Sequence, residues 1–280
     1  PITVLFVGAG KLFPALGVAI TRLLTGEGFR NAWIGPVHFR QTWRYYLIGW
    51  FGPIALVTIG AIAYFALNPG QFDTSMSSFA ETAWQMESAG QPMTMSSSQI
   101  VALGYAQLAL VIVAPLLNCV TCFGEEWGWR GYLLPHLSER CGVRIAVPVS
   151  GIIWGLWHAP ITVLGHNYGL GYPGWPILSI LAMCCLCVAL SYLFSWLTLR
   201  AQSCLPAVFA HGALNGCSAA PLMFMAGTAN PFVGPAPTGI IGGIGFLTWE
   251  DIRSNHLHFS RYRMQSKVIL TTTAILILLP

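Results

Sequence analysis

Charged residues are scarce in this chain of 280 residues: Asp, Glu, Lys and Arg make up 8% of it, whereas 55% is hydrophobic. A soluble domain is typically about 25% charged, so the composition excludes an ordinary soluble domain and indicates a membrane protein. Each transmembrane helix needs about 20 residues, and the length therefore predicts an all-α, polytopic bundle of about six to eight such helices. Because no polar stretch at either end is long enough for a second unit, we expect residues 1–280 to form one membrane-embedded domain.

Several other signatures are missing. The chain has no HExxH zinc motif, no internal repeat and no inverted pair of broken helices, and the missing repeat disfavours a transporter. Its net charge of +4 resides in loop arginines and does not indicate a nucleic-acid partner. No signal-peptide pattern opens the chain, which begins at Pro1 inside an apolar run, so an upstream segment is expected. The eight cysteines are interpreted as small core residues, since three of them lie within one apolar run.

Apolar runs and basic residues together predict a topology. The expected spans are residues 2–24, 45–67, 100–120, 145–164, 176–199 and 205–225, while the shorter runs 238–249 and 268–279 remain open. On this scheme the loop arginines fall on one side, and the three opposite loops, 68–98, 165–175 and 226–237, contain no Lys or Arg. By the positive-inside rule the basic loops of this integral, multi-pass protein face the cytoplasm.

The segment 123–137 places two adjacent carboxylates, Glu125 and Glu126, and the guanidinium of Arg130 among apolar residues. Charged groups at membrane depth are costly and therefore indicate a functional site. On a helix Glu126 and Arg130 share a face, whereas Glu125 points elsewhere. We predict that Glu126 is held in an ion pair while Glu125 has no such partner and can accept a proton. A purely structural Glu–Arg pair that locks two helices is the alternative.

Two further predicted spans carry polar side chains beside small residues. Trp154 and His158 are four residues apart on one span, and His211 and Asn215 are four apart on another. Residues at this spacing project from the same face of a helix. Small neighbours allow helices to approach closely, so we predict that the three polar segments converge on one cavity.

The converged side chains have a definite chemical capacity. A carboxylate with a neutral His can deprotonate a water molecule and return the proton to a leaving amine. A second His and an Asn amide can donate hydrogen bonds to an oxyanion, so water can attack a peptide bond without a Ser or Cys nucleophile. The alternative is a Zn²⁺ ion held by Glu125, His158 and His211, although each His comes from a different helix.

The three segments resemble the motifs of the CAAX protease and bacteriocin-processing family, also called the Abi family. These intramembrane endopeptidases resemble type II CAAX prenyl proteases. EEWGWR at 125–130 matches the family's EExxxR signature, and His211-x-x-x-Asn215 matches its HxxxN motif. Trp154-x-x-x-His158 is similar to the FxxxH motif, with Trp in place of Phe. The motifs occur in the family's order, and the family-like core covers about residues 100–222.

The resemblance implies a role for each matched residue. Glu125 and His158 would activate the water, while His211 and Asn215 would stabilise the oxyanion. Arg130 would position the site with Glu126 as its ion-pair partner, and Trp154 would keep an aromatic shelf. Family members are described as glutamate-dependent, which implies that no cofactor is required.

The expected function is that of a hydrolase, an intramembrane endopeptidase. Its partners would be the lipid bilayer and a membrane-bound or lipidated peptide, including the C-terminally prenylated CAAX type, and no nucleic acid. A different class of protein is the alternative: a non-catalytic membrane immunity or scaffold protein that retains the polar cluster structurally.

Overall fold

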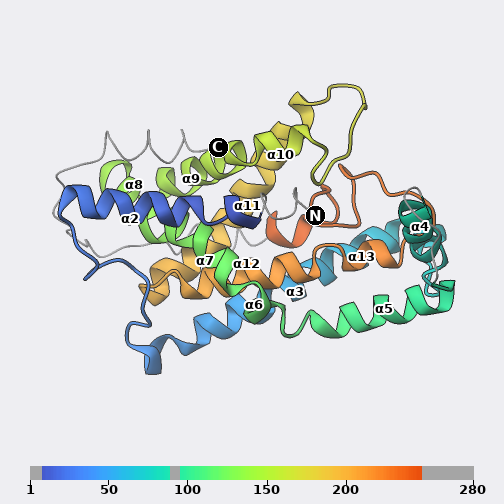
Figure 1. Cartoon of the computed structure of the whole chain (residues 1–280), viewed down its shortest axis with the longest axis horizontal. Coiled ribbons are helices and arrows are strands. Elements are labelled where there is room, and N and C mark those ends of the chain that lie inside the picture. Colours follow the sequence, from blue (N-terminus) through green and yellow to red (C-terminus); the bar gives the residue numbers. More distant parts are fainter. Residues whose placement is uncertain (1–7, 89–94, 248–280) are drawn as a thin grey trace.

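The computed structural model describes residues 8–88 and 95–247, and within them the chain is built from helices (Figure 1). Apart from helices, the described residues contain one isolated antiparallel bridge, between Phe72 and Met225. The predicted all-α fold is therefore confirmed. The α-helices are α2 Phe13–Thr25, α3 Phe39–Leu67, α4 Ser77–Ser88, α5 Ser97–Leu110, α6 Ala114–Leu117, α7 Cys119–Gly128, α8 Leu134–Cys141, α9 Val143–Trp157, α10 Ala159–Val163, α11 Ile177–Ala201, α12 Leu205–Cys217 and α13 Ala220–Met223; a 3₁₀ turn, η1 Pro69–Gln71, and a π-helical turn, η2 Trp129–Leu133, complete the list.

Two of the described helices, α3 and α11, are long and apolar enough to cross a membrane, and α9 is a shorter apolar helix. Helix α11 corresponds closely to the span predicted at 176–199, whereas α3 begins six residues before the predicted start at 45. The core of the molecule is organised around α11, where Leu193, Phe194 and Leu197 are at most 1% exposed.

Three other predicted spans are wrong as continuous helices. The run 100–120 is divided among α5, α6 and the start of α7, and the run 145–164 is interrupted at His158, between α9 and α10. The run 205–225 likewise ends one helix at Cys217 and begins another at Ala220. A proline occupies one of the first two positions of α6, α10 and α13, whereas α7 begins without one. Proline lacks the N–H that would continue the preceding helix but suits a helix's first turn, so hydropathy alone overlooks these breaks.

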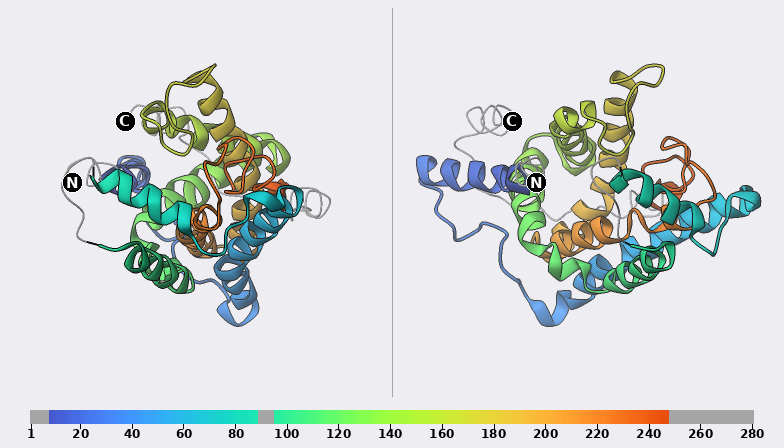
Figure 2. Two further views of the ribbon diagram at one scale, coloured as in Figure 1. Left: turned by 90° about the vertical axis from the view of Figure 1, so that its right-hand side faces the viewer. Right: turned by 45° about the vertical axis from the view of Figure 1, so that its right-hand side comes forward.

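The three loops without basic residues meet at one end of the molecule. The N–H of Asp73 donates to the carbonyl of Phe224 (2.9 Å), and the N–H of Ala226 donates to that of Gln71 (2.8 Å). The rings of Tyr168 and Phe232 stack with their centroids 5.0 Å apart. Helix α4 and the 226–237 loop lie at this end, and α8 lies at the other (Figures 1 and 2). Within residues 8–88 and 95–247, the three loops that lack basic residues thus lie together at one end of the fold.

Paired glycines explain how the helices that carry the three motifs approach their neighbours. Each of α7, α9 and α12 has two glycines four residues apart, which are Gly124 and Gly128, Gly151 and Gly155, and Gly212 and Gly216. A Cβ added at any of them would overlap or crowd another segment: residues 11–14 beside α7, α11 beside α9, and α6 beside α12. Small residues at this spacing permit the backbone contacts that drive helix association in membranes.

Candidate functional site

Both carboxylates of the EEWGWR segment are fully buried. Glu125 and Glu126 lie near the end of α7 and are 0% exposed, as is Arg130 in the π-helical turn η2 that follows directly. Single π-helical turns within α-helices occur frequently at functional sites. Buried charges are tolerated only when they are paired and hydrogen-bonded, so the contacts of these three side chains define the site.

Glu126 forms the predicted ion pair. Arg130 Nη1 lies 3.1 Å from both Glu126 oxygens and donates a hydrogen bond to Oε1. His211 Nδ1 lies 2.8 Å from the same Oε1. Because a carboxylate oxygen is an acceptor, His211 donates through Nδ1–H, and the imidazole is fixed in orientation by Glu126.

Arg130 also connects η2 to α9 and α11. Its Nη2 donates to Ser191 Oγ at 3.0 Å. Its guanidinium carbon lies 4.1 Å from the ring centroid of Trp154 and 5.2 Å from that of Phe194. Cation–π contacts of a desolvated guanidinium contribute about 2 kcal/mol each. Arg130 is therefore held on three sides and in turn fixes Glu126.

Glu125 has its own set of partners, and the expectation that it lacks a cationic one is wrong. Trp154 Nε1–H donates to its Oε2 at 2.9 Å, while Lys11 Nζ forms an ion pair with Oε1 at 3.3 Å. His211 Nε2 lies 4.0 Å from that same Oε1. An argument from i,i+4 spacing finds only partners on the same helix. Lys11 precedes α2 and contacts Glu125 from another segment.

One oxygen of Glu125 remains without a hydrogen bond from the protein. Oε1 is buried; Lys11 Nζ at 3.3 Å is not aligned to donate to it, and His211 Nε2 at 4.0 Å is too far away for a hydrogen bond. A buried charged oxygen normally accepts hydrogen bonds from protein or from ordered water. Oε1 can thus accept a hydrogen bond from an incoming water molecule. Glu126 Oε2 is also buried without a hydrogen bond, but it lies 3.1 Å from Arg130 Nη1 in the ion pair.

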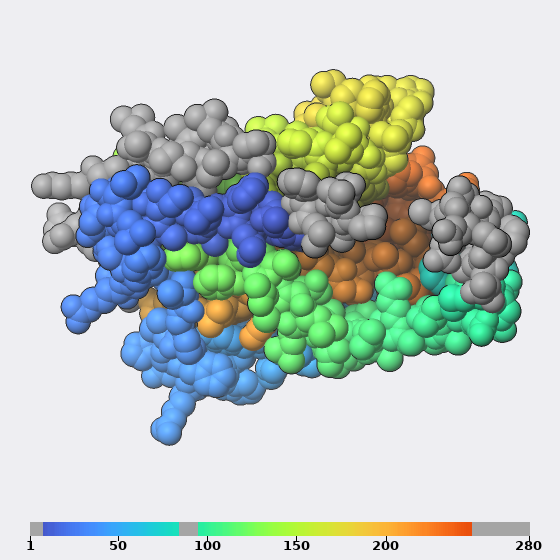
Figure 3. Space-filling view, viewed as in Figure 1, coloured from blue at the N-terminus to red at the C-terminus, as the bar shows by residue number. Residues whose placement is uncertain are grey.

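The approach of Lys11 depends on two glycines of α7. A Cβ on Gly124 would overlap the backbone carbonyl of Lys11, and a Cβ on Gly128 would overlap Pro14. Helix α2 therefore packs closely along α7, as the space-filling view also shows (Figure 3). Sequence reasoning missed Lys11 as a site residue, although one signal was available: it is a lysine inside a predicted span, where a charged residue is functional by default.

His158 lies at the C-terminal end of α9, next to the carboxylate. It is 7% exposed, and its Nδ1 lies 2.8 Å from the backbone carbonyl of Trp154. Because a carbonyl only accepts, Nδ1 carries the proton, and in the neutral ring Nε2 is the acceptor. Glu125 is within electrostatic range of His158. Trp154 thus contacts His158 through its backbone and Glu125 through its indole.

Asn215 does not join the carboxylate cluster. Asn215 is exposed, and its Nδ2 donates to Cys122 Sγ at 3.4 Å. Cys122 lies about one helical turn before Glu125 on α7. Four residues along a helix correspond to a rise of about 6 Å, so Asn215 shares a face with His211 but contacts the preceding turn of α7. The cluster consequently contains Glu125, Glu126, Arg130, Trp154, His158 and His211, with Asn215 at its edge and Lys11 added.

The alternative zinc site would take Glu125, His158 and His211 as its ligands. Within residues 8–88 and 95–247, no three His, Cys, Asp or Glu side chains are arranged to hold a metal ion. Both predicted histidine ligands use Nδ1 for a hydrogen bond, His158 to the carbonyl of Trp154 and His211 to Glu126, which leaves each Nε2 free. Glu125 is paired with Lys11, a cation that competes with a metal for the same oxygen.

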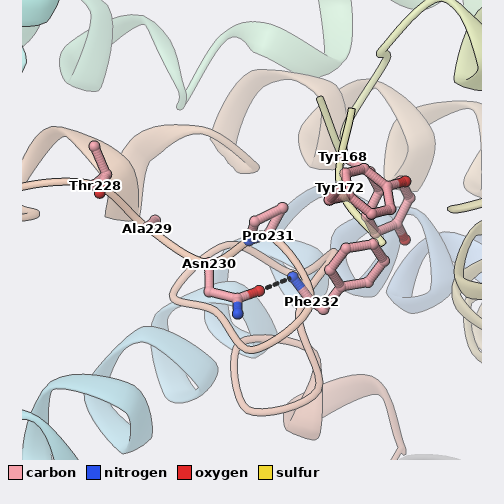
Figure 4. A pocket seen from close by; sticks show the side chains of 7 residues that line it. All are labelled: Tyr168, Tyr172, Thr228, Ala229, Asn230, Pro231 and Phe232. Atoms are coloured by element: carbon pink, nitrogen blue, oxygen red, sulfur yellow. Dashed lines mark hydrogen bonds between the residues drawn. The ribbon is translucent and has the colours of Figure 1, made fainter. Parts of the chain in front are cut away.

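A separate pocket of about 310 Å³ lies among the loops at the end that lacks basic residues (Figure 4). It is lined by Tyr168, Tyr172, Thr228, Ala229, Asn230, Pro231 and Phe232. Asn230 Oδ1 accepts a hydrogen bond from the N–H of Phe232 at 3.0 Å, which shapes its rim. None of the motif residues lines this pocket, so it is distinct from the carboxylate cluster.

Comparison with known proteins identifies the segment that holds this cluster. Residues 107–217 match the family model described as type II CAAX prenyl endopeptidase Rce1-like. The resemblance inferred from the three motifs is confirmed. Together with helices α3 and α11, the family match characterises the chain as a membrane protein. The matched range contains all three motifs of this Rce1-like segment but does not include Lys11.

One curated relative supports the same family. The protein named CAAX prenyl protease 2 from Methanococcus maripaludis is 41% identical to this chain over 44 residues, which are 16% of either chain. The similarity therefore covers a small part of that relative's length. No solved structure matches the chain.

Proposed function

We propose that this chain is an intramembrane endopeptidase that uses Glu125 and His158 to activate water for the hydrolysis of a peptide bond. One observation carries the proposal: Glu125 Oε1 is a fully buried carboxylate oxygen to which the described protein donates no hydrogen bond, between a lysine and a histidine. The match of residues 107–217 to an endopeptidase family supports the same reaction class.

The reaction begins with a water molecule that donates a hydrogen bond to Glu125 Oε1 and faces His158 Nε2. Glu125 takes a proton from this water as the oxygen forms a bond to the carbonyl carbon of the substrate. The resulting tetrahedral intermediate collapses when the proton passes to the leaving nitrogen and the C–N bond breaks. The products are a carboxylic acid and an amine, which ionise to a carboxylate and an ammonium, and the Glu125 carboxylate is regenerated. General acid–base catalysis of this kind contributes about 10²–10⁴-fold to a rate.

His211 is the group best placed to stabilise the oxyanion of the intermediate by a hydrogen bond. Its Nδ1–H is committed to Glu126, so the ring is held with Nε2 directed toward the region of Glu125 Oε1. When the ring carries both protons, Nε2–H donates to the negative oxygen. A fixed donor of this type typically accounts for about 10²–10³-fold of the rate. Asn215, which is exposed beside Cys122, is assigned to the substrate backbone at the edge of the site.

The substrate we propose is a membrane-associated peptide, and the C-terminally prenylated CAAX type is the first candidate. Two names support this candidate: the curated relative is called CAAX prenyl protease 2, and the family is described as a type II CAAX prenyl endopeptidase. The basic loops are proposed to face the cytoplasm, because Lys and Arg are excluded from the loops at the opposite end.

The purified protein in lipid vesicles tests the proposal. It would be incubated with a farnesylated CAAX peptide, with the same peptide lacking the lipid, and with a farnesylated peptide of scrambled C-terminal sequence. Mass spectrometry of the products would locate the cleaved bond. We expect cleavage of a lipidated peptide by the wild type and none by Glu125→Gln. If a folded wild type cleaves no membrane peptide in an extended panel, a non-catalytic immunity or scaffold role replaces the proposal.

A further inference from the structure

The cation that faces Glu125 comes from outside the segment that matches the endopeptidase family. Lys11 Nζ lies 3.3 Å from Glu125 Oε1, and its side chain is 25% exposed whereas the carboxylate is 0% exposed. The matched range begins only at residue 107. Lys11 is therefore partly exposed to solvent and at the same time contacts a carboxylate inside the site.

The N-terminal arm, residues 8–33, contacts the segment 123–137 at several places. Near its start, the backbone at Lys11 and Pro14 fills the space left by Gly124 and Gly128. Farther along, Arg22 Nη1 donates to Glu27 Oε2 at 2.8 Å, and Glu27 Oε1 accepts from Tyr132 Oη at 2.9 Å. Because Tyr132 belongs to η2, these contacts join the arm to the segment that bears the two carboxylates.

The charged and titratable groups around Glu125 show which cation is paired with it. From its own segment Glu125 has Glu126 and Arg130 nearby, and Arg130 is already committed to Glu126. The remaining titratable groups near it are Cys122 on α7 itself and, from other elements, His158, His166, His211 and Cys187. Among the described residues, Lys11 is therefore the one Lys or Arg paired with Glu125.

We propose that Lys11 is a positioning residue for Glu125, which keeps this carboxylate ionised and its Oε1 directed toward the substrate water. The inference rests on the proposed endopeptidase function and extends the catalytic unit to the N-terminal arm. Lys11 does not itself exchange a proton with the substrate in this scheme. Its effect is on the base, so its loss lowers the rate of the chemical step more than substrate binding.

Cleavage kinetics of Lys11→Met and Lys11→Arg, measured beside wild type in the same vesicles, test this role. We expect Lys11→Met to lower kcat by roughly tenfold or more, a part of the full contribution of a general base, with KM changed by less than about twofold. Lys11→Arg keeps the charge and should recover most of the lost kcat. Arg30→Met removes an exposed cation from the same arm and serves as the matched control, with kcat unchanged.

A thermal double-mutant cycle tests the ion pair without requiring cleavage. Lys11→Met should lower the melting temperature in the wild-type background but much less in Glu125→Gln, because the buried charge is then absent. Equal losses in both backgrounds would overturn the pairing. Normal kcat in Lys11→Met, with an active wild type, would overturn the positioning role alone, whereas an inactive wild type would overturn the proposed function.

Discussion

The indole N–H of Trp154 donates a 2.9 Å hydrogen bond to Glu125 Oε2, and the same ring lies beneath the guanidinium of Arg130. One side chain of α9 therefore contacts the proposed base and the cation that anchors its neighbour, Glu126. The sequence resemblance has Phe at this position, and Phe could provide the ring surface but not the hydrogen bond. In this chain the Trp is a hydrogen-bond donor to the base as well as an aromatic shelf.

Trp154→Phe should separate these two functions of the indole. The phenyl ring keeps the contact with Arg130, whereas the buried Glu125 loses one donor. Hydrogen bonds to charged groups contribute about 1.5–3 kcal/mol, so we expect a loss of stability of that size and a lower kcat. Trp157→Phe is the matched control, since its indole makes ring contacts with Trp129 and His158. Equal effects of the two substitutions on thermal unfolding would remove the special role of the hydrogen bond.

Arg130 should tolerate neither neutralisation nor replacement by lysine. Arg130→Met leaves Glu126 as a buried charge without its cation, which costs about 3–5 kcal/mol. Arg130→Lys keeps the charge, but one ammonium cannot reproduce the planar guanidinium that bonds Glu126 and Ser191 at once and stacks on Trp154. We expect reduced folded yield for both variants, with the lysine variant intermediate. Yield and melting temperature of Arg130→Lys equal to wild type would contradict this assignment.

Gly124→Ala should displace the N-terminal arm from α7. The added methyl group would overlap the carbonyl of Lys11, and overpacking of this kind costs about 1–3 kcal/mol. Gly52→Ala in α3 is the control, because its Cβ would meet only a side-chain carbon at 3.6 Å. Thermal unfolding and protease accessibility of the arm measure the effect. If both alanine variants behave alike, the close approach at Gly124 is not required.

The stability of the first turn of α4 should decrease in acid because of Asp73. Its carboxylate accepts hydrogen bonds from the hydroxyl and N–H groups of Ser75 and Ser77, which hold the pKa of Asp73 well below its usual range. Because the folded pKa lies below the unfolded value of about 3.9, the contribution is complete above that pH and is lost as pH falls through the folded pKa. Hydrogen exchange at Ser77 and Ser78 should therefore show less protection at pH 3 than at pH 7 after correction for intrinsic rates. Asp73→Asn should abolish this difference, and a difference that persists in the variant would contradict the assignment.

Sequence reasoning succeeded where the relationship was local or where close packing could be anticipated. The Glu126–Arg130 pair follows from spacing on one helix, and His211 reaches Glu126 from another helix, as the predicted convergence of the polar segments requires. It failed for Lys11, since no rule of spacing along one helix reveals a partner from a distant segment. Asn215 was assigned to the cluster because it shares a face with His211, but the rise of the helix takes it to Cys122 instead.

The central claim is that two adjacent buried carboxylates have different tasks, Glu125 as the base and Glu126 as the ion-pair partner of Arg130. The most direct measurement is peptide cleavage and melting temperature for Glu125→Gln and Glu126→Gln, both in vesicles beside wild type. We predict that Glu125→Gln keeps near-normal folding but loses cleavage, because an amide cannot take the proton of water. Glu126→Gln should lose stability together with activity, since Arg130 then lacks its counter-charge. A well-folded Glu125→Gln protein with near-normal turnover would contradict the account.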